Sequence, residues 1–362
     1  MMKQGWEIKK LGDVATILDS QRKPVTKKDR CNGIYPYYGA SGVQDYVDKY
    51  IFDGRYLLVG EDGAKWGASD KSAYIVDGKC WVNNHAHILK LDNSINDKMV
   101  EYYLVYKDLS EYITGAIVPK LTQQALKQIP IPVPERAEQE RIVGELDCLS
   151  GIIAAKRAQL RELDTLAQSI FYTMFGDPIT NDKGWSVKQL KDVSTLINGR
   201  AYKQEELLSE GKYKVIRVGN FFTNGDYYYS DLELDDDKYC DIGDLLFAWS
   251  ASFGAFIWNG GKVIYHYHIW KVLFDERKLN IQYYRYILNV MTNDFMKDVH
   301  GIGMFHLTKA GMEQYKLPIP PLSLQNEFAE KIENIERQKE LITKSIKETE
   351  DLFNSRMSYY FD

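Results

Sequence analysis

The 362-residue chain has few cysteines and no long apolar run. No window approaches the roughly 18 consecutive apolar residues that a membrane-spanning helix needs, so we expect no membrane partner. The four cysteines, Cys31, Cys80, Cys148 and Cys240, show neither CxxC spacing nor a disulfide framework. The opening segment, MMKQGWEIKK, also lacks an apolar signal core. Together these absences predict a protein of the reducing cytoplasm.

Motifs for nucleotide binding and catalysis are missing as well. Residues 254–262 (GAFIWNGGK) have the wrong spacing for the P-loop GxxxxGK[ST], and Val263 follows the lysine. Residues 301–306 (GIGMFH) lack the third glycine of GxGxxG and follow no convincing strand. We therefore predict that this chain has no catalytic residue, no cofactor of its own and no cofactor-binding or metal-binding residue.

An excess of positive charge is also lacking, since the formal net charge is −5. Residues 1–134 carry 18 basic and 16 acidic side chains, and residues 178–320 carry 17 and 18, so the acidity lies in the remaining segments. Neutralisation of phosphates by Lys and Arg drives most non-specific affinity for nucleic acid. Neither part is therefore expected to bind DNA tightly alone, and partner subunits would contribute basic surface.

The chain does contain an internal repeat whose period is about half its length. Residues 5–16 (GWEIKKLGDVAT) return as residues 184–195 (GWSVKQLKDVST), with seven identities in twelve positions. Between the shared positions the halves diverge, which favours the same task performed on two different targets over duplicated structural domains that drifted apart. Later matches keep the same order: Leu57-Leu58 with Leu245-Leu246, HxHIxK at 85–90 with 266–271, Leu121-Thr122 with Leu307-Thr308, and Pro-Ile-Pro at 130–132 with 318–320.

Each half ends in a long charged segment with a heptad pattern. Apolar residues alternate in steps of four and three, which is typical of a coiled-coil seam. Two seams of matching length are expected to pair antiparallel, because a globular part separates them in the chain. The first seam is Ile142, Leu146, Leu149, Ile153, Leu160, Leu163, Ala167, Ile170 and Met174, interrupted by Lys156; the second is Phe328, Ile332, Ile335, Ile342, Ile346, Phe353 and Tyr360, interrupted by Lys339, Thr349 and Arg356.

From Ile142 to Met174 such a helix spans about 48 Å at ~1.5 Å per residue. DNA half-sites one turn apart are separated by roughly 34–36 Å, so the helices have the scale of a ruler between two binding sites. The alternative is a helical hairpin that only stabilises the fold or dimerises the protein. The predicted limits are a first domain at 1–134, a central spacer helix at 135–177, a second domain at 178–320 and a C-terminal spacer helix at 321–362.

The globular halves combine short runs rich in Val, Ile and Tyr with isolated helical patterns. Tyr56–Val59 and Val263–Tyr265 are expected as strands, and Lys98–Leu109 and Ile281–Val290 as helices. The predicted fold class is α+β, with two tandem mixed α/β domains joined by long helices that form an antiparallel coiled coil.

Several polar loops offer side chains suited to base edges, where Arg and Lys favour guanine and Asn and Gln favour adenine. An ordinary solvated loop is the alternative for each of them. The predicted DNA-contacting residues are Arg22, Lys23, Tyr38, Ser41, Lys65, Asn84 and His85 in the first half, and Trp249, Ser250, Ser252, His266, Tyr267, His268 and His306 in the second.

The duplicated HxH pairs keep a second class of function open. Two histidines two apart on a strand point to the same face and suit a metal or acid–base chemistry. No cysteine or carboxylate recurs near them in both halves, so the pattern lacks a third ligand. A duplicated His-dependent or metal-dependent enzyme is the alternative to DNA recognition, and a coiled-coil scaffold without DNA is a third interpretation.

Taken as a set, these motifs resemble the specificity (S) subunit of type I restriction-modification systems over essentially the full length. The resemblance is carried by GWxxKxLxDV, by the Pro-Ile-Pro exit into Glu138-Gln139-Glu140 or Gln325-Asn326-Glu327, and by Phe175-Gly176-Asp177-Pro178 before the second Gly-Trp. It implies two target-recognition domains that each read half of a split site on double-stranded DNA. It also implies separate partners: modification (M) subunits, expected as two copies and using S-adenosylmethionine, and ATP-driven restriction (R) subunits.

Overall fold

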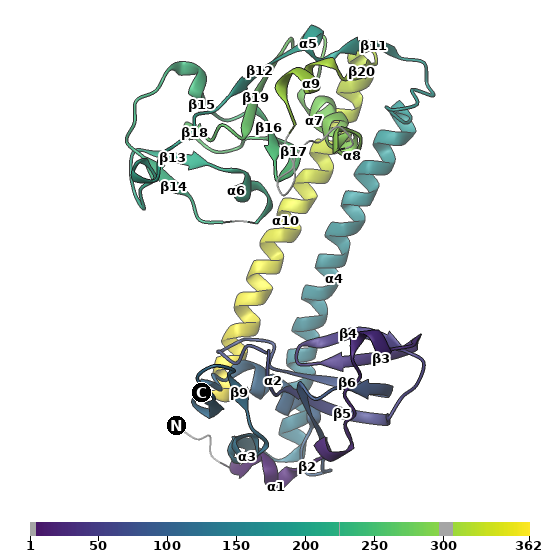
Figure 1. The fold of residues 1–362 in the computed structure, drawn as a ribbon, viewed down its shortest axis with the longest axis vertical. Coiled ribbons are helices and arrows are strands. Elements are labelled where there is room, and N and C mark those ends of the chain that lie inside the picture. The colour runs from purple at the N-terminus through teal and green to yellow at the C-terminus, as the bar shows by residue number, and fades with distance from the viewer. Residues whose placement is uncertain (1–4, 224, 297–306) are drawn as a thin grey trace. The chain divides into compact units, whose positions relative to one another are not determined.

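The computed structural model describes residues 5–223, 225–296 and 307–362, which fold into two compact units (Figure 1). Within those ranges, the first unit takes in the chain up to residue 158 together with 343–362, and the second takes in 159–342. Two long helices, α4 (Arg136–Phe175) and α10 (Leu322–Phe361), belong partly to each unit. The mixture of sheets and helices confirms the predicted α+β class, while the four predicted domain limits stay predictions.

The first unit is built on a six-stranded sheet with the order β2-β7-β5-β6-β3-β4. Most of its pairs are antiparallel, but β3 runs parallel to β6. The elements are β1 (Glu7–Lys10), α1 (Leu11–Val14), β2 (Ala15–Ile17), β3 (Asn32–Gly39), β4 (Gly42–Val47), β5 (Phe52–Gly60), β6 (Ala73–Val82), β7 (Ala86–Leu91), α2 (Asp97–Tyr106), β8 (Ile113–Thr114), β9 (Lys120–Leu121), α3 (Gln123–Gln128) and β10 (Pro130–Val133).

The second unit divides its strands between two four-stranded sheets, β12-β19-β16-β17 and β14-β13-β18-β15. Here β13 runs parallel to β18, as β3 does to β6 in the first unit. The elements are β11 (Ser186–Gln189), α5 (Leu190–Val193), β12 (Ser194–Asn198), β13 (Tyr213–Ile216), α6 (Val218–Phe222), β14 (Tyr228–Ser230), β15 (Tyr239–Cys240), β16 (Leu245–Ser250), β17 (Ser252–Ile257), β18 (Val263–Tyr265), β19 (Ile269–Phe274), α7 (Ile281–Val290), α8 (Thr292–Phe295), α9 (Lys309–Gln314) and β20 (Lys316–Ile319).

The repeat found in the sequence is a repeat of backbone hydrogen bonding. Thr122 caps α3 by accepting from Ala125 N, and Thr308 caps α9 by accepting from Gly311 N. Each Gly-Trp segment leads into a strand that pairs antiparallel with its own Pro-Ile-Pro segment, β1 with β10 and β11 with β20. The two halves therefore share one scaffold.

A buried glutamine at the start of each long helix ties that helix to its globular part. Gln139 accepts from Asn96 N at 2.6 Å and donates to Ser94 O and Pro134 O. Its counterpart Gln325 accepts from Asn280 N at 2.8 Å and makes the same two kinds of bond to carbonyl oxygens. Both side chains are at most 1% exposed, and each glutamine satisfies one fully buried carbonyl and two partly buried backbone groups.

In the first unit, the early part of α4 packs against the late part of α10. Arg356 and Tyr360 both bond to Glu145. Further along α4, Lys156 donates to Ser345 Oγ at 2.5 Å and to Thr349 Oγ1 at 3.2 Å. Residue numbers rise along one helix as they fall along the other, so the pairing is antiparallel, and the polar interruption at Lys156 faces polar partners.

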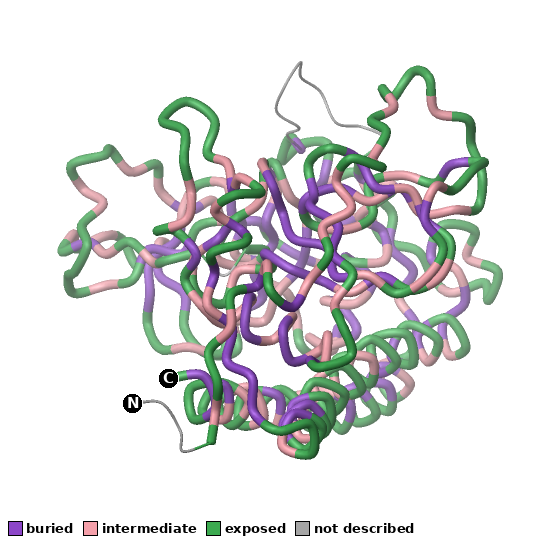
Figure 2. The backbone as a smooth tube through the Cα atoms, turned by 90° about the horizontal axis from the view of Figure 1, so that it is seen from below, coloured by how far each residue is buried: buried purple, intermediate pink, exposed green. Residues whose placement is uncertain are grey.

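The second unit shows the same arrangement with the remaining parts of the two helices. The rings of Phe171 and Phe328 lie 5.7 Å apart, and Lys339 Nζ lies 2.7 Å from Asp164 Oδ1. Every predicted seam residue in both helices is buried or half-buried. The antiparallel coiled coil is thus confirmed, and Figure 2 shows buried residues recurring along otherwise exposed helices.

The core of each unit includes the helix ends that reach it. Ile142, Leu146 and Tyr360 belong to the first core, and Phe171 and Phe328 belong to the second. The globular parts therefore bury apolar surface on the coiled coil as well as on their own sheets. The predicted helices near 98–109 and 281–290 are confirmed as α2 and α7, and these too pack into the two cores. No helix among the described residues is long and apolar enough to span a membrane.

Candidate nucleic-acid interface

A three-residue turn leads into equivalent strands of the two units, and the two turns together carry five of the fourteen predicted DNA-contacting residues. In the first unit residues 83–85 (Asn-Asn-His) join β6 to β7, and in the second residues 266–268 (His-Tyr-His) join β18 to β19. We refer to both as the variable turn. Its outer backbone bond is the same in the two units, since Glu61 N donates to His85 O and Trp249 N donates to His268 O.

Strand register corrects the alignment of the two HxHIxK motifs. Ala15 pairs with Leu91, and its repeat partner Ser194 pairs with Phe274. The structural counterpart of His85 is therefore His268, and the counterpart of His87 is Trp270. The motif match had paired His85 with His266 and His87 with His268, two residues out of register, so the expectation of an equivalent histidine pair in both halves is wrong.

The first residue of each variable turn holds the turn in shape. Asn83 Oδ1 accepts from His85 N at 2.8 Å, and His266 Nδ1 accepts from His268 N at 3.4 Å. Burial lowers the pKa of His266 to about 4, with further lowering from the charges of His268 and Arg217. The ring is therefore neutral near pH 7 and keeps a nitrogen lone pair for this bond. One backbone turn thus presents Asn84 and His85 in one unit and Tyr267 and His268 in the other.

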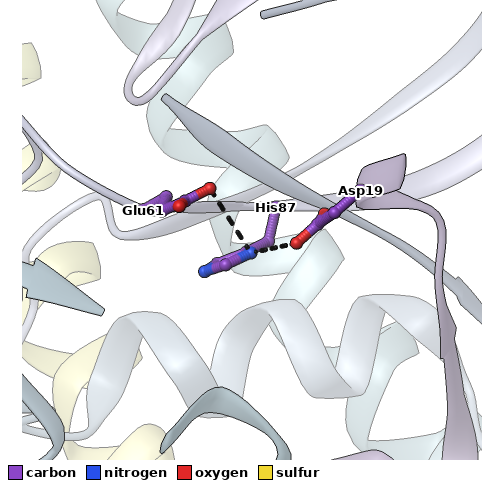
Figure 3. A group of neighbouring side chains, drawn as sticks. All are labelled: Asp19, Glu61 and His87. Atoms are coloured by element: carbon purple, nitrogen blue, oxygen red, sulfur yellow. Dashed lines mark hydrogen bonds and ion pairs between the residues drawn. The ribbon is translucent and has the colours of Figure 1, made fainter. Parts of the chain in front are cut away.

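Behind the first variable turn lies a cluster of charged side chains, Asp19, Arg22, Glu61, His87 and Lys120, which we call the ion cluster. Figure 3 shows the carboxylates of Asp19 and Glu61 both directed at one nitrogen of the His87 ring. His87 Nδ1 lies 2.6 Å from Asp19 Oδ2 and 3.7 Å from Glu61 Oε2. On the other side of the ring, Nε2 lies 2.7 Å from Leu121 O. Both ring nitrogens of His87 therefore lie within hydrogen-bond distance of internal oxygen atoms.

The two cations of the ion cluster offset its carboxylates. Arg22 Nη1 lies 2.5 Å from Glu61 Oε2, and Lys120 Nζ lies 2.7 Å from Glu61 Oε1. Burial raises the pKa of Asp19, but the hydrogen bond and charge of His87 outweigh it, and the net pKa lies below the ordinary value. Burial raises that of Glu61 as well, and bonds from Lys120 and Arg22 bring its pKa below the ordinary value.

Asp19, Glu61 and His87 place three potential ligand atoms within 4.8 Å of one another. The sequence pattern showed no third ligand recurring beside the histidines in both halves, and the fold brings these two carboxylates to His87 in the first unit only. Each of those groups already bonds to Arg22, Lys120 or a backbone carbonyl, so a metal ion would have to displace internal cations. The geometry is that of a structural ion network, and the absence of a metal site stays a prediction.

In the second unit, aromatic side chains occupy the corresponding positions. Trp270 stands where His87 stands, and Trp249 stands where Glu61 stands, their rings stacked 5.3 Å apart. Trp270 Nε1 donates to Asn198 Oδ1 at 3.1 Å, just as His87 bonds to Asp19. One unit therefore supports its variable turn with charges, and the other supports it with stacked indoles.

The remaining predicted contacts differ in their exposure. Tyr267 packs on His268 with ring centroids 3.9 Å apart, and Trp249 Nε1 donates to Tyr267 O. Arg22 is only 12% exposed and donates to Ala86 O at 2.7 Å, so its guanidinium braces the turn. His306 lies outside the described residues. Lys23, Ser41, Lys65, Asn84, His85 and Tyr267 are exposed, Arg22, Tyr38, Trp249, Ser252, His266 and His268 are half-buried, and Ser250 is buried.

The structure also brings residues to the variable turns that sequence reasoning did not select. His85 Nδ1 bonds to Asp62, and Asn83 Nδ2 donates to Gln44 Oε1 at 3.1 Å. In the second unit Arg217 and Asn220 line a pocket with His266 and His268. These residues lie tens of positions from the turns, and only the sheet topology brings them there.

Comparison with known proteins gives a consistent picture. The family model described as "Type I restriction modification DNA specificity domain" matches residues 3–164 and again 182–351. A putative type I restriction enzyme specificity subunit of Haemophilus influenzae is 26% identical over 98% of this chain and 94% of its own length. The MjaVIII specificity subunit of Methanocaldococcus jannaschii is 21% identical over 96% of this chain and 92% of its own.

Two solved structures share the fold. The S subunit of a type I restriction-modification system from M. genitalium superposes with a TM-score of 0.61 at 13% identity, covering 99% of this chain and 96% of that one. A chain from a structure describing assembly and conformational transition of the type I R-M system superposes with a TM-score of 0.55 at 15% identity, covering 100% and 98%.

Proposed function

Because the chain belongs to the type I restriction-modification DNA specificity family, we propose that it is a specificity subunit in which each globular part reads half of a bipartite DNA site. The observation that carries the proposal is the variable turn. The same three-residue connection, held by the same backbone bonds, presents Asn84-His85 in one unit and Tyr267-His268 in the other. One backbone that presents different side chains in the two units suits the recognition of two different DNA sequences.

The exposed residues at the turns have the chemistry of base readers. Asn84 suits an adenine edge, His85 and His268 donate or accept, and Tyr267 offers a planar ring and a hydroxyl. Lys23 and Lys65 are exposed cations suited to phosphates, which position a protein on DNA without specifying sequence. Ser250 and Arg22 would support this surface from within, because the first is buried and the second is committed to the ion cluster.

Affinity would come largely from partner subunits. The chain carries a formal net charge of −5, so its own phosphate neutralisation is weak. We propose that two M subunits, which bind S-adenosylmethionine, and ATP-dependent R subunits supply the chemistry in the cytoplasm. This chain would supply recognition without a catalytic residue or cofactor.

The enzyme alternative loses its main support. That hypothesis depended on a histidine pair duplicated in both halves, and the counterpart of His87 is Trp270. His87 itself bonds through both ring nitrogens to internal groups, which leaves no nitrogen for a substrate.

The test is co-expression with an M subunit of the same system, followed by mapping of methylated adenines in host DNA. A split motif with a fixed gap is the expected result. The change His85→Ala should relax positions in one half only, and Tyr267→Ala should relax positions in the other. A complex that forms and yet methylates no bipartite motif would overturn the proposal.

A further inference from the structure

A pocket of about 260 Å³ opens beside the second variable turn. The pocket lies at the end of β13, beside the point where its parallel neighbour β18 continues into the variable turn. A hydrogen bond from His266 N to Ile216 O joins the two strands there. Most of its lining residues carry polar or charged side chains. The lining residues are Arg217, Val218, Gly219, Asn220, Gly225, Asp226, Tyr228, His266 and His268.

Arg217 is the cation of this pocket, and its guanidinium is uncommitted within the described part of the chain. The side chain is exposed, and its guanidinium carbon lies 5.2 Å from the ring centre of Tyr228. Among the described residues no carboxylate or carbonyl oxygen accepts from its guanidinium, whereas Arg22 and Arg200 are both paired with glutamates. An arginine stacked on an aromatic ring keeps its planar fork of donors directed outward.

Hydrogen bonds fix the surroundings of Arg217, and one carboxylate, Asp226, also lines the pocket. Asn220 Oδ1 accepts from Arg217 N at 2.8 Å, and Asn220 Nδ2 donates to Gly225 O at 2.7 Å, which holds both walls of the pocket. His266 is neutral near pH 7, since its pKa is about 4 through burial and through the charges of His268 and Arg217. The pocket therefore presents the guanidinium of Arg217 beside the neutral ring of His266, with the carboxylate of Asp226 also in its wall but not ion-paired with Arg217 among the described residues.

The first unit fills the same place differently. The bond from Asn83 N to Tyr38 O matches the bond from His266 N to Ile216 O, so Gly39 is the counterpart of Arg217. A Cβ on Gly39 would lie 2.1 Å from Gln44 Nε2. The space next to the turn is thus taken by a glutamine amide in one unit and left open beside an arginine in the other.

Resting on the proposed function, we propose that Arg217 is a specificity-determining residue that reads a guanine in the half-site of the second unit. Two guanidinium N–H groups would donate to guanine O6 and N7 in the major groove, the pairing that an arginine fork fits best. His268 and Tyr267 would face the neighbouring bases. The first unit lacks an arginine at this position, so its own half-site would not require a guanine there.

The first experiment compares three complexes with the M subunit, containing the unaltered chain, Arg217→Ala or Arg217→Lys, by mapping methylated adenines. Arg217→Ala is expected to lose the requirement for one guanine in one half-site, with discrimination falling on the order of ten- to a hundredfold, and Arg217→Lys, which lacks the planar fork, is expected to keep only part of that discrimination. The other half-site and the gap should not change. Lys214→Ala removes a cation that lies over Tyr227 outside the pocket, and as a matched control it should leave every position of the motif unchanged.

A second measurement does not depend on how the variants fold. The affinity of the unaltered complex is compared for duplexes with guanine or 7-deazaguanine at that position, because the analogue lacks the N7 acceptor. About a tenfold loss is expected for the unaltered complex and no loss for Arg217→Ala. A motif that Arg217→Ala leaves unchanged, or a loss of methylation that is the same whichever base stands at that position, would reduce Arg217 to a phosphate contact and overturn the inference. Absence of any bipartite motif with the unaltered chain would instead overturn the proposed function.

Discussion

Trp270 occupies in the second unit the backbone position that His87 occupies in the first. Both side chains donate to equivalent residues of the repeat, Asp19 just after β2 and Asn198 at the end of β12. The two units have thus kept the hydrogen bond that fixes the variable turn while exchanging the chemistry that makes it. Variants of the supporting residues should therefore affect one half-site at a time.

Arg22→Ala tests whether the ion cluster supports recognition. Its guanidinium bonds to Glu61, Asp19 and Ala86 O, and its removal leaves buried carboxylates with fewer partners. Loss of one partner of a buried ion pair costs about 3 kcal/mol or more. We expect the first unit to unfold at lower denaturant concentration, and methylation to become less specific at one half-site only. Lys23→Ala, an exposed neighbour, is the control and should leave stability within about 0.5 kcal/mol. Equal stability of the Arg22 and Lys23 variants would contradict a supporting role.

The charge on Asp19 predicts a pH dependence. Its pKa in the folded chain lies below the ordinary value of an aspartate, because the bond and charge of His87 outweigh the opposing effect of burial. A depressed carboxyl pKa contributes stability above the unfolded pKa, and that stability is lost as the pH falls through the folded pKa. Asp19→Asn should therefore lower the free energy of unfolding at pH 7. The difference from the unaltered chain should become smaller only below about pH 4. Denaturant unfolding at pH 7, 5 and 3 measures this, and Asn198→Ala should show a deficit that does not vary with pH.

The sequence predicted the repeat, the helices and the seam because each is a local periodic signal. It misaligned the histidine motifs because a shift of two residues preserves which face of a strand each side chain occupies. Lys90 and Lys271 match as letters, yet Lys90 is exposed and Lys271 bonds to Asp244 at 2.7 Å. Only the pairing partners, Thr16 for Lys90 and Ile197 for Lys271, reveal the true register.

The ion cluster and the Arg217 pocket were not predictable for a related reason. Asp19 lies 68 positions before His87, and Glu61 lies 39 positions after Arg22. Strands β2, β5 and β7 bring these residues together, and no spacing in the chain marks them. The half-sites themselves were not predictable from the sequence. The two units share one backbone at the variable turns, and only the side chains expected to face DNA differ between them.

Gln139 and Gln325 make equivalent hydrogen bonds in the two units, so the same substitution can be compared at both positions. Gln139→Ala and Gln325→Ala each leave one partly buried N–H and two carbonyl oxygens without their partner. Unsatisfied buried polar groups cost roughly 1–3 kcal/mol each. Each variant should lower the stability of its own unit by a similar amount, measured by hydrogen exchange in α2 for the first and α7 for the second. Protection lost in both helices from a single variant would show that the two units do not respond independently.

The coiled coil predicts how the gap in the DNA site is set. Deleting 154–160 from α4 and 343–349 from α10 removes seven residues from each helix, including Lys156 with both of its partners, Ser345 and Thr349. The heptad phase is kept on both sides, and each helix shortens by about 10.5 Å at ~1.5 Å per residue. If the helices act as a ruler, the gap should shrink by about three base pairs, at roughly 3.4 Å per pair, while both half-sites stay the same.

Mapping of methylated adenines reads the gap directly. Deleting 154–160 alone is the control, because it leaves seven residues of α10 facing no partner seam. That variant should fail to give a fixed gap or a stable complex. Half-sites that change in the double deletion would show that the helices take part in reading bases, and an unchanged gap would show that the M subunits, and not this coiled coil, set the distance.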